Sequence, residues 1–419
     1  MTTETQKIKM GYKQTELGVI PEDWDVGIFG ACADIYRGGS PRPIQSYLTH
    51  DPDGINWIKI GDVNLGARYI TSTEEKINQE GSQYSRKVNV GDFLLSNSMS
   101  FGRPYVLRIN GCIHDGWLAI QNYKEIFNTE YLYYILSSKT VLDQYFQLAS
   151  GSSVLNLNKA VVSTVKLPIP KVQEQSAIAA ALSDADELIE KLERLIKKKK
   201  NIKQGAMQEL LTGKKRLSGF SKKWETKILG NVANFEHGYG LSKSDLNENG
   251  RHKCIHYGQL FTGYKELIRE IKSKTNINTN NFYSKGNDVL MPTSDVTPRG
   301  LATASCIKED GIILGGGILI VRLHTGYDGL YLSYFISQNK NAVLKLVKGS
   351  TVFHLYANDL AKLEIIFPEH KEQTAIANVL SEMDTEIEKL ESQLVKYQNI
   401  KQGMMQQLLT GKIRIYGNK

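Results

Sequence analysis

Two long stretches of the chain carry apolar residues at the alternating three- and four-residue spacing of a coiled-coil helix. The first stretch shows Ile178, Leu182, Ala185, Ile189, Leu192 and Ile196, and resumes at Ala206 and Leu210. The second shows Ile376, Leu380, Met383, Ile387, Leu390, Leu394 and Tyr397, and resumes at Met404 and Leu408. About 38 residues per helix predict rods of about 57 Å. We expect the two helices to pair, and the alternative is an ordinary buried helix in each half.

Local signals mark the ends of these helices. Pro170 and Pro368 favour a start, and Gly213 and Gly411 in LTGK favour a stop. Gly205 and Gly403 lie inside the pattern at a cost of about 1 kcal/mol each relative to Ala, so they indicate either a close helix crossing or a break. The lysine run 197–200 is either a solvated face or a contact for DNA phosphates.

The two helical stretches are copies of one another. EQSAIAAALSDADELIEKLERLIKKKKNIKQGAMQELLTGKKR begins at Glu174, and EQTAIANVLSEMDTEIEKLESQLVKYQNIKQGMMQQLLTGKIR begins at Glu372. By direct comparison about 27 of roughly 43 positions are identical, far more than chance gives. The segments before the copies correspond more loosely, as in EDWDVGIFG and KKWETKILG or GSSVLNL and GSTVFHL. The chain is therefore a tandem duplication.

The regions outside the helices predict two mixed domains. Short β-rich runs such as NWIKIGDV and IILGGGILIVRL are broken by Gly, Pro, Asn and Ser, and each half also has one helical run. This pattern favours duplicated α/β or α+β domains, each joined to one of the two long helices. We expect a first domain at 1–170, a central helix at 171–213, a second domain at 214–368 and a C-terminal helix at 369–412.

Composition narrows the class of protein. The formal charge of +8 favours a polyanionic partner. No apolar run is long enough for a membrane span or a signal peptide, so we expect a cytoplasmic protein with no membrane partner. Four widely spaced cysteines, with no CxxC pair, predict neither a metal site nor a disulfide framework.

The loops of both domains carry side chains suited to DNA. Arg and Lys pair with guanine or phosphate, Asn and Gln read adenine, and Ser, Thr and backbone amides bind phosphate oxygens. The candidates are Arg37, Ser40, Arg42, Asn97, Arg103, Ser152, Ser153, Asn156, Tyr239, Lys243, Tyr257, Gln259, Thr293, Arg299, Ser350, Thr351 and His354. Loops of this composition also occur in many proteins that bind no DNA.

With these motifs the chain resembles the specificity subunits of type I restriction-modification enzymes over essentially its whole length. The resemblance lies in GYKQTELGVIPEDW, GGSP followed by NWIKIGDVN, the run LNLNKAVVSTVKLPIPKVQEQSAIA with its second version, and KQGAMQELLTGK with KQGMMQQLLTGK. One departure is GYGLSKS at 238–244, where the first domain has GGSPRP at 38–43.

The resemblance implies a protein without a catalytic centre that reads double-stranded DNA. Each domain would bind one half of a split, asymmetric target. The two long helices would form an antiparallel coiled coil with pseudo-two-fold symmetry, and its length would set the gap between the halves. Two modification subunits would dock on the chain, and restriction subunits would add translocation and cleavage. S-adenosylmethionine, ATP and Mg²⁺ are expected on those partners and not on this chain.

Two other interpretations remain. One is a coiled-coil scaffold protein that does not read DNA. The other is a nuclease that uses the loose PD…ExK pattern of Asp53, Glu74 and Lys76 to hold a metal, although the second half has no counterpart. Gly315 to Gly317 predict a bulge or close backbone approach, and adjacent His114 and Asp115 predict a turn or core role.

Overall fold

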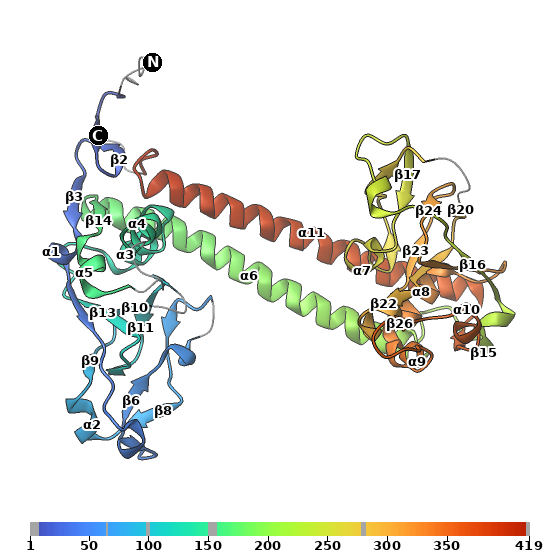
Figure 1. Cartoon of the computed structure of the whole chain (residues 1–419), viewed down its shortest axis with the longest axis horizontal. Coiled ribbons are helices and arrows are strands. Elements are labelled where there is room, and N and C mark those ends of the chain that lie inside the picture. The colour runs from blue at the N-terminus through green and yellow to red at the C-terminus, as the bar shows by residue number, and fades with distance from the viewer. Residues whose placement is uncertain (1–7, 64–65, 98–100, 150–156, 278–281, 416–419) are drawn as a thin grey trace. The chain divides into compact units, whose positions relative to one another are not determined.

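The computed structural model describes residues 8–63, 66–97, 101–149, 157–277 and 282–415, and the chain divides into two compact units. Unit 1 combines Met1–Leu192 with Gln393–Lys419, and unit 2 is Glu193–Ser392. The long helices α6 (Val172–Leu210) and α11 (His370–Leu408) each contribute one part to each unit (Figure 1). The coiled-coil spacing of the sequence thus correctly predicted two 39-residue helices.

Unit 1 contains two five-stranded sheets. Their strand orders are β4-β13-β10-β11-β7 and β5-β8-β6-β12-β9. The pairs β7–β11 and β6–β12 are parallel and the others antiparallel, so both sheets are mixed. The strands of these sheets are β4 (Asp34–Arg37), β5 (Leu48–Thr49), β6 (Ile55–Ile58), β7 (Tyr69–Ile70), β8 (Glu75–Ile77), β9 (Arg86–Val88), β10 (Phe93–Ser96), β11 (Pro104–Leu107), β12 (Gly111–Ile113) and β13 (Trp117–Gln121).

Among its described residues, unit 1 also has two smaller strand pairs, five α-helices besides the long ones, and the 3-10 helices η1 (Ile44–Ser46) and η2 (Ile60–Asp62). The pairs are β1 (Tyr12–Thr15) with β2 (Gly18–Pro21), and β3 (Asp25–Ile28) with β14 (Lys166–Ile169). The helices are α1 (Phe29–Cys32), α2 (Gln79–Gln83), α3 (Thr129–Leu136), α4 (Lys139–Ala149) and α5 (Lys159–Thr164). The start of α3 is capped by the Asn128 side chain, which accepts hydrogen bonds from two backbone amides of the first turn.

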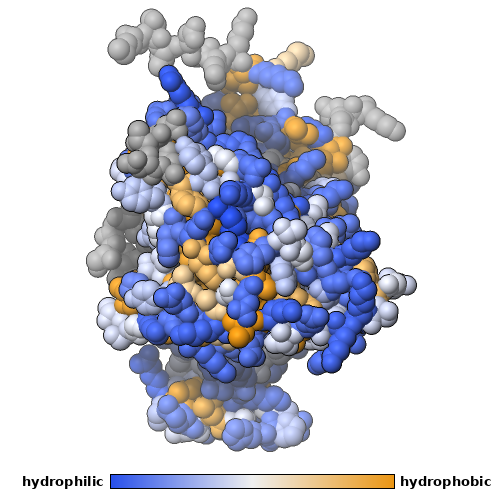
Figure 2. All heavy atoms as spheres, turned by 90° about the vertical axis from the view of Figure 1, so that its right-hand side faces the viewer, coloured by the Kyte–Doolittle hydropathy of each residue, from blue (hydrophilic) through white to orange (hydrophobic). Residues whose placement is uncertain are grey.

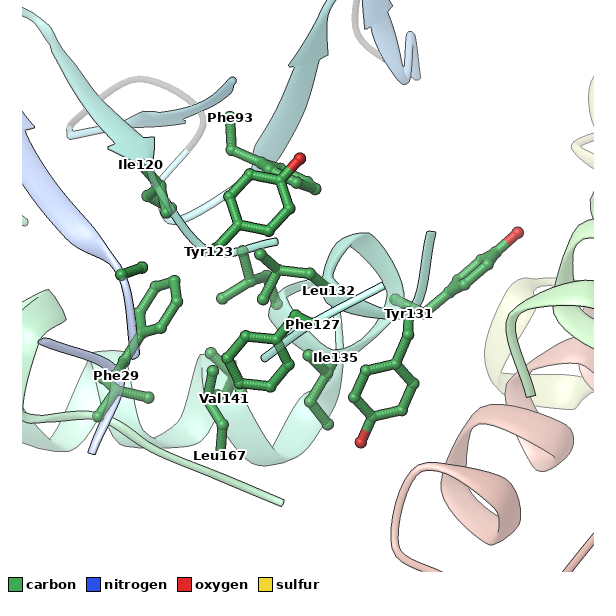
Figure 3. Packing of buried hydrophobic residues seen from close by; sticks show 14 of the residues in the cluster. Phe29, Phe93, Ile120, Tyr123, Phe127, Tyr131, Leu132, Ile135, Val141 and Leu167 are labelled. Atoms are coloured by element: carbon green, nitrogen blue, oxygen red, sulfur yellow. The ribbon is translucent and has the colours of Figure 1, made fainter. Parts of the chain in front are cut away.

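The main core of unit 1 lies where the first sheet meets these helices. Phe93 and Ile120 of the sheet, Phe29 of α1 and Leu132 of α3 are all fully buried (Figure 3). Ile178 of α6 and Leu408 of α11 belong to the same cluster. The first turns of one long helix and the last turns of the other therefore form part of the domain core.

Unit 2 repeats this architecture. Its sheets have the orders β16-β25-β21-β23-β18 and β19-β17-β24-β20, and β18–β23 and β17–β24 are the parallel pairs. The strands are β16 (Ala233–His237), β17 (His252–Ile255), β18 (Leu267–Ile268), β19 (Ser273–Thr275), β20 (Phe282–Tyr283), β21 (Val289–Pro292), β23 (Ser305–Ile307), β24 (Ile313–Leu314) and β25 (Ile318–Leu323).

The smaller elements of unit 2 include one feature that unit 1 does not show among its described residues. β15 (Glu225–Ile228) pairs with β27 (Glu364–Phe367), as β3 pairs with β14. The helices are α7 (Gln259–Thr262), α8 (Gly329–Gln338), α9 (Lys340–Leu344), α10 (Ala357–Leu360) and the 3-10 helix η5 (Pro298–Ala302). The additional feature is a ribbon of β22 (Ser294–Asp295) and β26 (Phe353–His354).

A glutamate that opens each copy of the repeat anchors the long helix to its domain. In unit 1 the carboxylate of Glu174, which is 3% exposed, accepts hydrogen bonds from Trp24 Nε1 at 2.9 Å and Arg414 Nη2 at 2.7 Å. The equivalent contacts in unit 2 join Glu372 to Trp224 Nε1 at 3.0 Å and to Arg216 Nη2 at 2.6 Å. The repeated Glu, Trp and Arg therefore form the same hydrogen-bonded group in both units.

A lysine–aspartate pair joins α6 to α11 within each unit. Lys401 of α11 lies 2.5 Å from Asp186 of α6 in unit 1, and Asp186 also accepts a hydrogen bond from Tyr134. In unit 2 Lys203 of α6 lies 2.6 Å from Asp384 of α11, which accepts from Tyr334. In both units a later position on one helix faces an earlier position on the other, so the paired segments are antiparallel. The expected coiled coil with duplicated mixed domains is confirmed.

The predicted seam residues are buried or half-buried. Exposure is below one tenth for Ile178, Leu182, Leu192, Ile196, Leu210, Ile376, Leu380, Ile387 and Leu408. Ile189, Leu390 and Leu394 are half-buried.

Glycines at the ends and in the middle of the helices have different roles. Gly213 and Gly411 follow the helices with φ of +70° and +67°, as expected of C-terminal stops. Gly205 and Gly403 mark neither a break nor a close internal crossing. Both helices continue through them, and a Cβ atom at either position would meet nothing within 4 Å.

Candidate nucleic-acid interface

In unit 1 the carboxylate of Asp115 holds three side chains from the loops at one end of the sheets. Asp115 lies in the turn between β12 and β13. Its Oδ1 accepts a hydrogen bond from Ser40 Oγ at 3.0 Å and lies 2.9 Å from His114 Nε2, while its Oδ2 lies 3.6 Å from Arg42 Nη2. The turn expected for His114 and Asp115 is present, and it also organises the loop beside it.

The backbone carbonyl of Asp115 adds two more predicted residues. Arg37 Nε and Asn97 Nδ2 each donate to this oxygen at 3.4 Å. Arg37, Ser40, Arg42, Asn97, His114 and Asp115 are called the Asp115 cluster below. Four of the DNA-binding candidates thus meet around one acidic residue, for which the sequence predicted only a turn or core role.

The close approach of two loops is what allows this cluster to form. A Cβ atom on Gly38 would lie 2.1 Å from the carbonyl oxygen of His114, so a residue with a side chain would push the loops apart. Beside the cluster is a pocket of about 410 Å³, lined by Arg42, Trp57, Lys59 and other residues. Arg42 is 82% exposed at its side chain, so its guanidinium is available to an external ligand.

Unit 2 keeps the backbone of this site and replaces its side chains. A Cβ atom on Gly238 would lie 2.1 Å from the oxygen of Gly315, which repeats the relation of Gly38 to His114. Gly316 N donates to Gly240 O at 2.7 Å, and Gly317 has φ of +80°. The glycine run was expected to mark a close backbone approach, and this is confirmed. It stands where unit 1 has His114, Asp115 and Gly116.

Aromatic rings take the place of the charged cluster. The Tyr257 ring packs on Gly317 and lies 4.7 Å from the His256 ring, centroid to centroid. Tyr239 is 63% exposed, and Thr293 donates to the Gly317 carbonyl through both its N–H and its hydroxyl. These five residues are called the Gly317 cluster.

The surroundings of His256 favour the neutral form of its imidazole. Burial, and then the positive charge of Lys243, lower the pKa of its imidazole. Its Nδ1 accepts a hydrogen bond from Gly258 N at 3.2 Å. The neighbouring candidate Gln259 is engaged at both ends of its amide, with His256 N and with Ser273 Oγ.

The remaining candidates lie at varied positions. Arg103 is half-buried with its guanidinium over the Tyr105 ring at 5.9 Å. His354 is in β26, and Arg299 is an exposed residue of η5. Ser350 and Thr351 are exposed just before β26. Ser152, Ser153 and Asn156 lie outside the described residues.

Two residues of the loose PD…ExK pattern, Asp53 and Lys76, make local hydrogen bonds to the loop at 51–52. Lys76 Nζ donates to the backbone carbonyl of Pro52 at 2.5 Å, and the Asp53 N–H donates to Asp51. Within the described ranges, no group of three or more His, Cys, Asp or Glu side chains could hold a metal ion.

Seen from the side of the second domain, the surface is hydrophilic over most of its area and encloses a smaller apolar region (Figure 2). Among the helices that the structure describes, none is both long enough and apolar enough to cross a membrane.

The fold and the corresponding loop clusters define a class: a duplicated protein with one loop cluster of the same backbone arrangement in each half. A family model for the type I restriction modification DNA specificity domain matches the chain twice, over residues 21–204 and 221–397. The chain belongs to the type I restriction-modification DNA specificity family.

Relatives and solved structures agree with this assignment. A protein of Methanocaldococcus jannaschii whose name describes a specificity subunit of type I restriction enzyme MjaX is 26% identical over 438 residues, covering 96% of this chain and 97% of that protein. A chain from a structure of a type I R-M system is 16% identical with a TM-score of 0.59, covering 94% of this chain and 99% of that chain. The S subunit from M. genitalium is 14% identical with a TM-score of 0.57, covering 92% and 96%. These structures support the fold alone.

Proposed function

We propose that this chain recognises a bipartite, asymmetric DNA target, one half-site per domain, and supplies no catalysis itself. The observation that carries the proposal is the replacement of side chains on a repeated backbone. Where unit 1 has His114 and Asp115 in the turn that meets Gly38, unit 2 has Gly315 and Gly316 in the turn that meets Gly238, and the side chains around the two turns also differ. Base edges are read by side chains, so one scaffold with two sets of side chains reads two different sequences.

Double-stranded DNA is the partner that the charge favours. The chain has 52 Lys and Arg against 44 Asp and Glu, and the exposed cations Arg37, Arg42, Lys243 and Arg299 lie at or near the loop clusters. Neutralising phosphates releases counterions, so binding should weaken steeply with salt.

Two modification subunits would dock on the helices, each beside a repeated glycine. The segment Asn-Ile-Lys-Gln-Gly is identical in the two copies. Ile202 and Ile400 are 47% and 42% exposed, and the space beside Gly205 and Gly403 is open. Since Ile and Gly three residues apart share a helix face, each copy offers an apolar contact and room for the backbone of another helix.

Catalysis is expected from those partners. S-adenosylmethionine would be bound by the modification subunits, which methylate adenine, and ATP and Mg²⁺ by restriction subunits. The docking proposal is tested by co-purifying the chain with modification subunits after changing both Ile202 and Ile400 to Glu. We expect the modification subunits to be lost, whereas Val395→Glu, at a 56% exposed position of the same helix as Ile400, should retain them. Retention by the double variant would contradict this docking surface.

The spacing of the half-sites is tested separately. Inserting two helical turns in the middle of α6 should change the preferred gap between half-sites or abolish assembly. Unchanged spacing with full activity would contradict the spacer role of the helices.

A further inference from the structure

The β22–β26 ribbon of unit 2 ends in an exposed pair of valines. Ser294 pairs with His354 and Asp295 with Phe353. Val296 directly follows β22 and Val352 directly precedes β26, so the two valines lie at the same end of the ribbon. Val296 is 71% exposed and Val352 is 45% exposed. Both valines are apolar and exposed, and together they are called the apolar tip of the ribbon.

Local hydrogen bonds hold this tip in shape. The Asp295 carboxylate accepts from Val296 N and from Thr297 Oγ1, both at 2.7 Å. On the other strand, Lys348 and His354 exchange two backbone hydrogen bonds, at 2.9 and 2.7 Å. The valines are therefore presented by a fixed backbone, which lowers the conformational entropy lost on binding.

The ribbon is continuous with the Gly317 cluster. Thr293, the residue before β22, donates to the Gly317 carbonyl, and Leu355, the residue after β26, donates through its N–H to Thr293 O at 2.9 Å. A ligand that contacts Tyr257 and Gly317 would thus meet the ribbon as well.

Cations flank the apolar tip. Arg299 is exposed on η5, which packs against both strands of the ribbon. The Lys348 side chain is 64% exposed, and its Nζ lies 2.7 Å from Asp359 Oδ2. Two-stranded ribbons fit the DNA major groove, where phosphates line the edges. The apolar group that base edges present in that groove is the C5 methyl of thymine.

We propose that Val296 and Val352 contact thymine methyl groups in the half-site that the second domain reads. This inference rests on the proposed DNA-reading function. It predicts that the second half-site contains at least one A·T pair whose thymine methyl contributes to affinity.

The test uses the assembled complex of this chain with its modification subunits and its mapped target. Duplexes are compared in which uracil replaces each thymine of one half-site, which removes only the methyl group. We expect about four-fold weaker binding for each contacted methyl of the second half-site. The complex carrying Val296→Ala and Val352→Ala should bind thymine and uracil duplexes equally, whereas Val90→Ala, at a 49% exposed position of unit 1, should keep the difference.

Three results would overturn the inference while leaving the proposed function intact. They are a second half-site without A·T pairs, a wild-type complex indifferent to uracil in that half-site, and an equal uracil effect in the valine variant. A complex with no sequence-specific DNA binding at all would overturn the proposed function and the inference together.

Discussion

Arg414 and Glu174, separated by 240 residues in sequence, form two hydrogen bonds in unit 1, one of 2.7 Å between Nη2 and Oε2. The Glu174 side chain is only 4% exposed. The end of the chain thereby completes the domain that its beginning forms. A buried carboxylate without its partner is costly, because its charge loses water and gains no compensation.

We therefore expect Arg414→Ala to destabilise unit 1 by about 3 kcal/mol. Hydrogen exchange of the unit 1 sheets, compared with those of unit 2, measures the loss where it occurs. Lys412→Ala, at an exposed position of the same segment, is the control and should change little. Uniform loss of protection across both units would contradict a role confined to unit 1.

The two equivalent lysine–aspartate pairs should contribute unequally. Side-chain exposure is 14% and 9% for Lys203 and Asp384, but 24% and 27% for Lys401 and Asp186. Removing one partner costs more where the other is left buried. Lys203→Met should therefore destabilise its unit by about 3 kcal/mol and Lys401→Met by about 1 kcal/mol. Urea unfolding followed separately in each unit checks this order, and equal losses would argue against it.

The lowered pKa of His256 makes unit 2 sensitive to acid. Burial is the main cause, and the charge of Lys243 adds to it. The unfolded chain takes up a proton near pH 6.5 while the folded unit resists it, so stability should fall as the pH drops from 6.5 toward the folded-state pKa. His256→Gln should flatten this part of the curve of unfolding free energy against pH. A wild-type curve that stays flat from pH 7 to 5 would contradict the assignment.

Arg42 offers a way to separate base contact from phosphate contact. If it contacts phosphate, Arg42→Lys should bind DNA nearly as well as the wild type. If it forks onto guanine, Arg42→Lys should lose about 1–3 kcal/mol and relax specificity at one position of the first half-site. We expect the second result, since Asp115 and Ser40 place the guanidinium in a fixed loop.

Binding is measured with the assembled complex on duplexes that vary one base at a time. Lys139→Ala is the matched control, because Lys139 is a 75% exposed cation paired with Asp143 on α4. Full binding and unchanged specificity in Arg42→Ala would remove Arg42 from the interface.

The periodic parts of this structure were predictable from the sequence because their cause is local. Ile178 and Leu182 recur at helical spacing, and Gly213 ends α6 by its own backbone preference. The duplication seen in the sequence also appears in the structure, because the hydrogen bond from Trp24 to Glu174 recurs between Trp224 and Glu372.

The loop clusters were only partly predictable, because their geometry depends on tertiary contacts. Arg37, Ser40 and Asn97 were candidates by residue type, but their meeting at Asp115 requires the strand order of the sheets. The placement of Val296 and Val352 at one end of the ribbon depends on the pairing of β22 with β26, which no local pattern encodes.

The most direct test of the account is to express the chain with its modification subunits in a host and map methylated adenines by single-molecule sequencing. We predict one split DNA sequence with a fixed gap, and Arg42→Lys and Thr293→Ala should each relax only one of its two halves. Methylation that does not depend on this chain, or a single uninterrupted motif, would contradict the account.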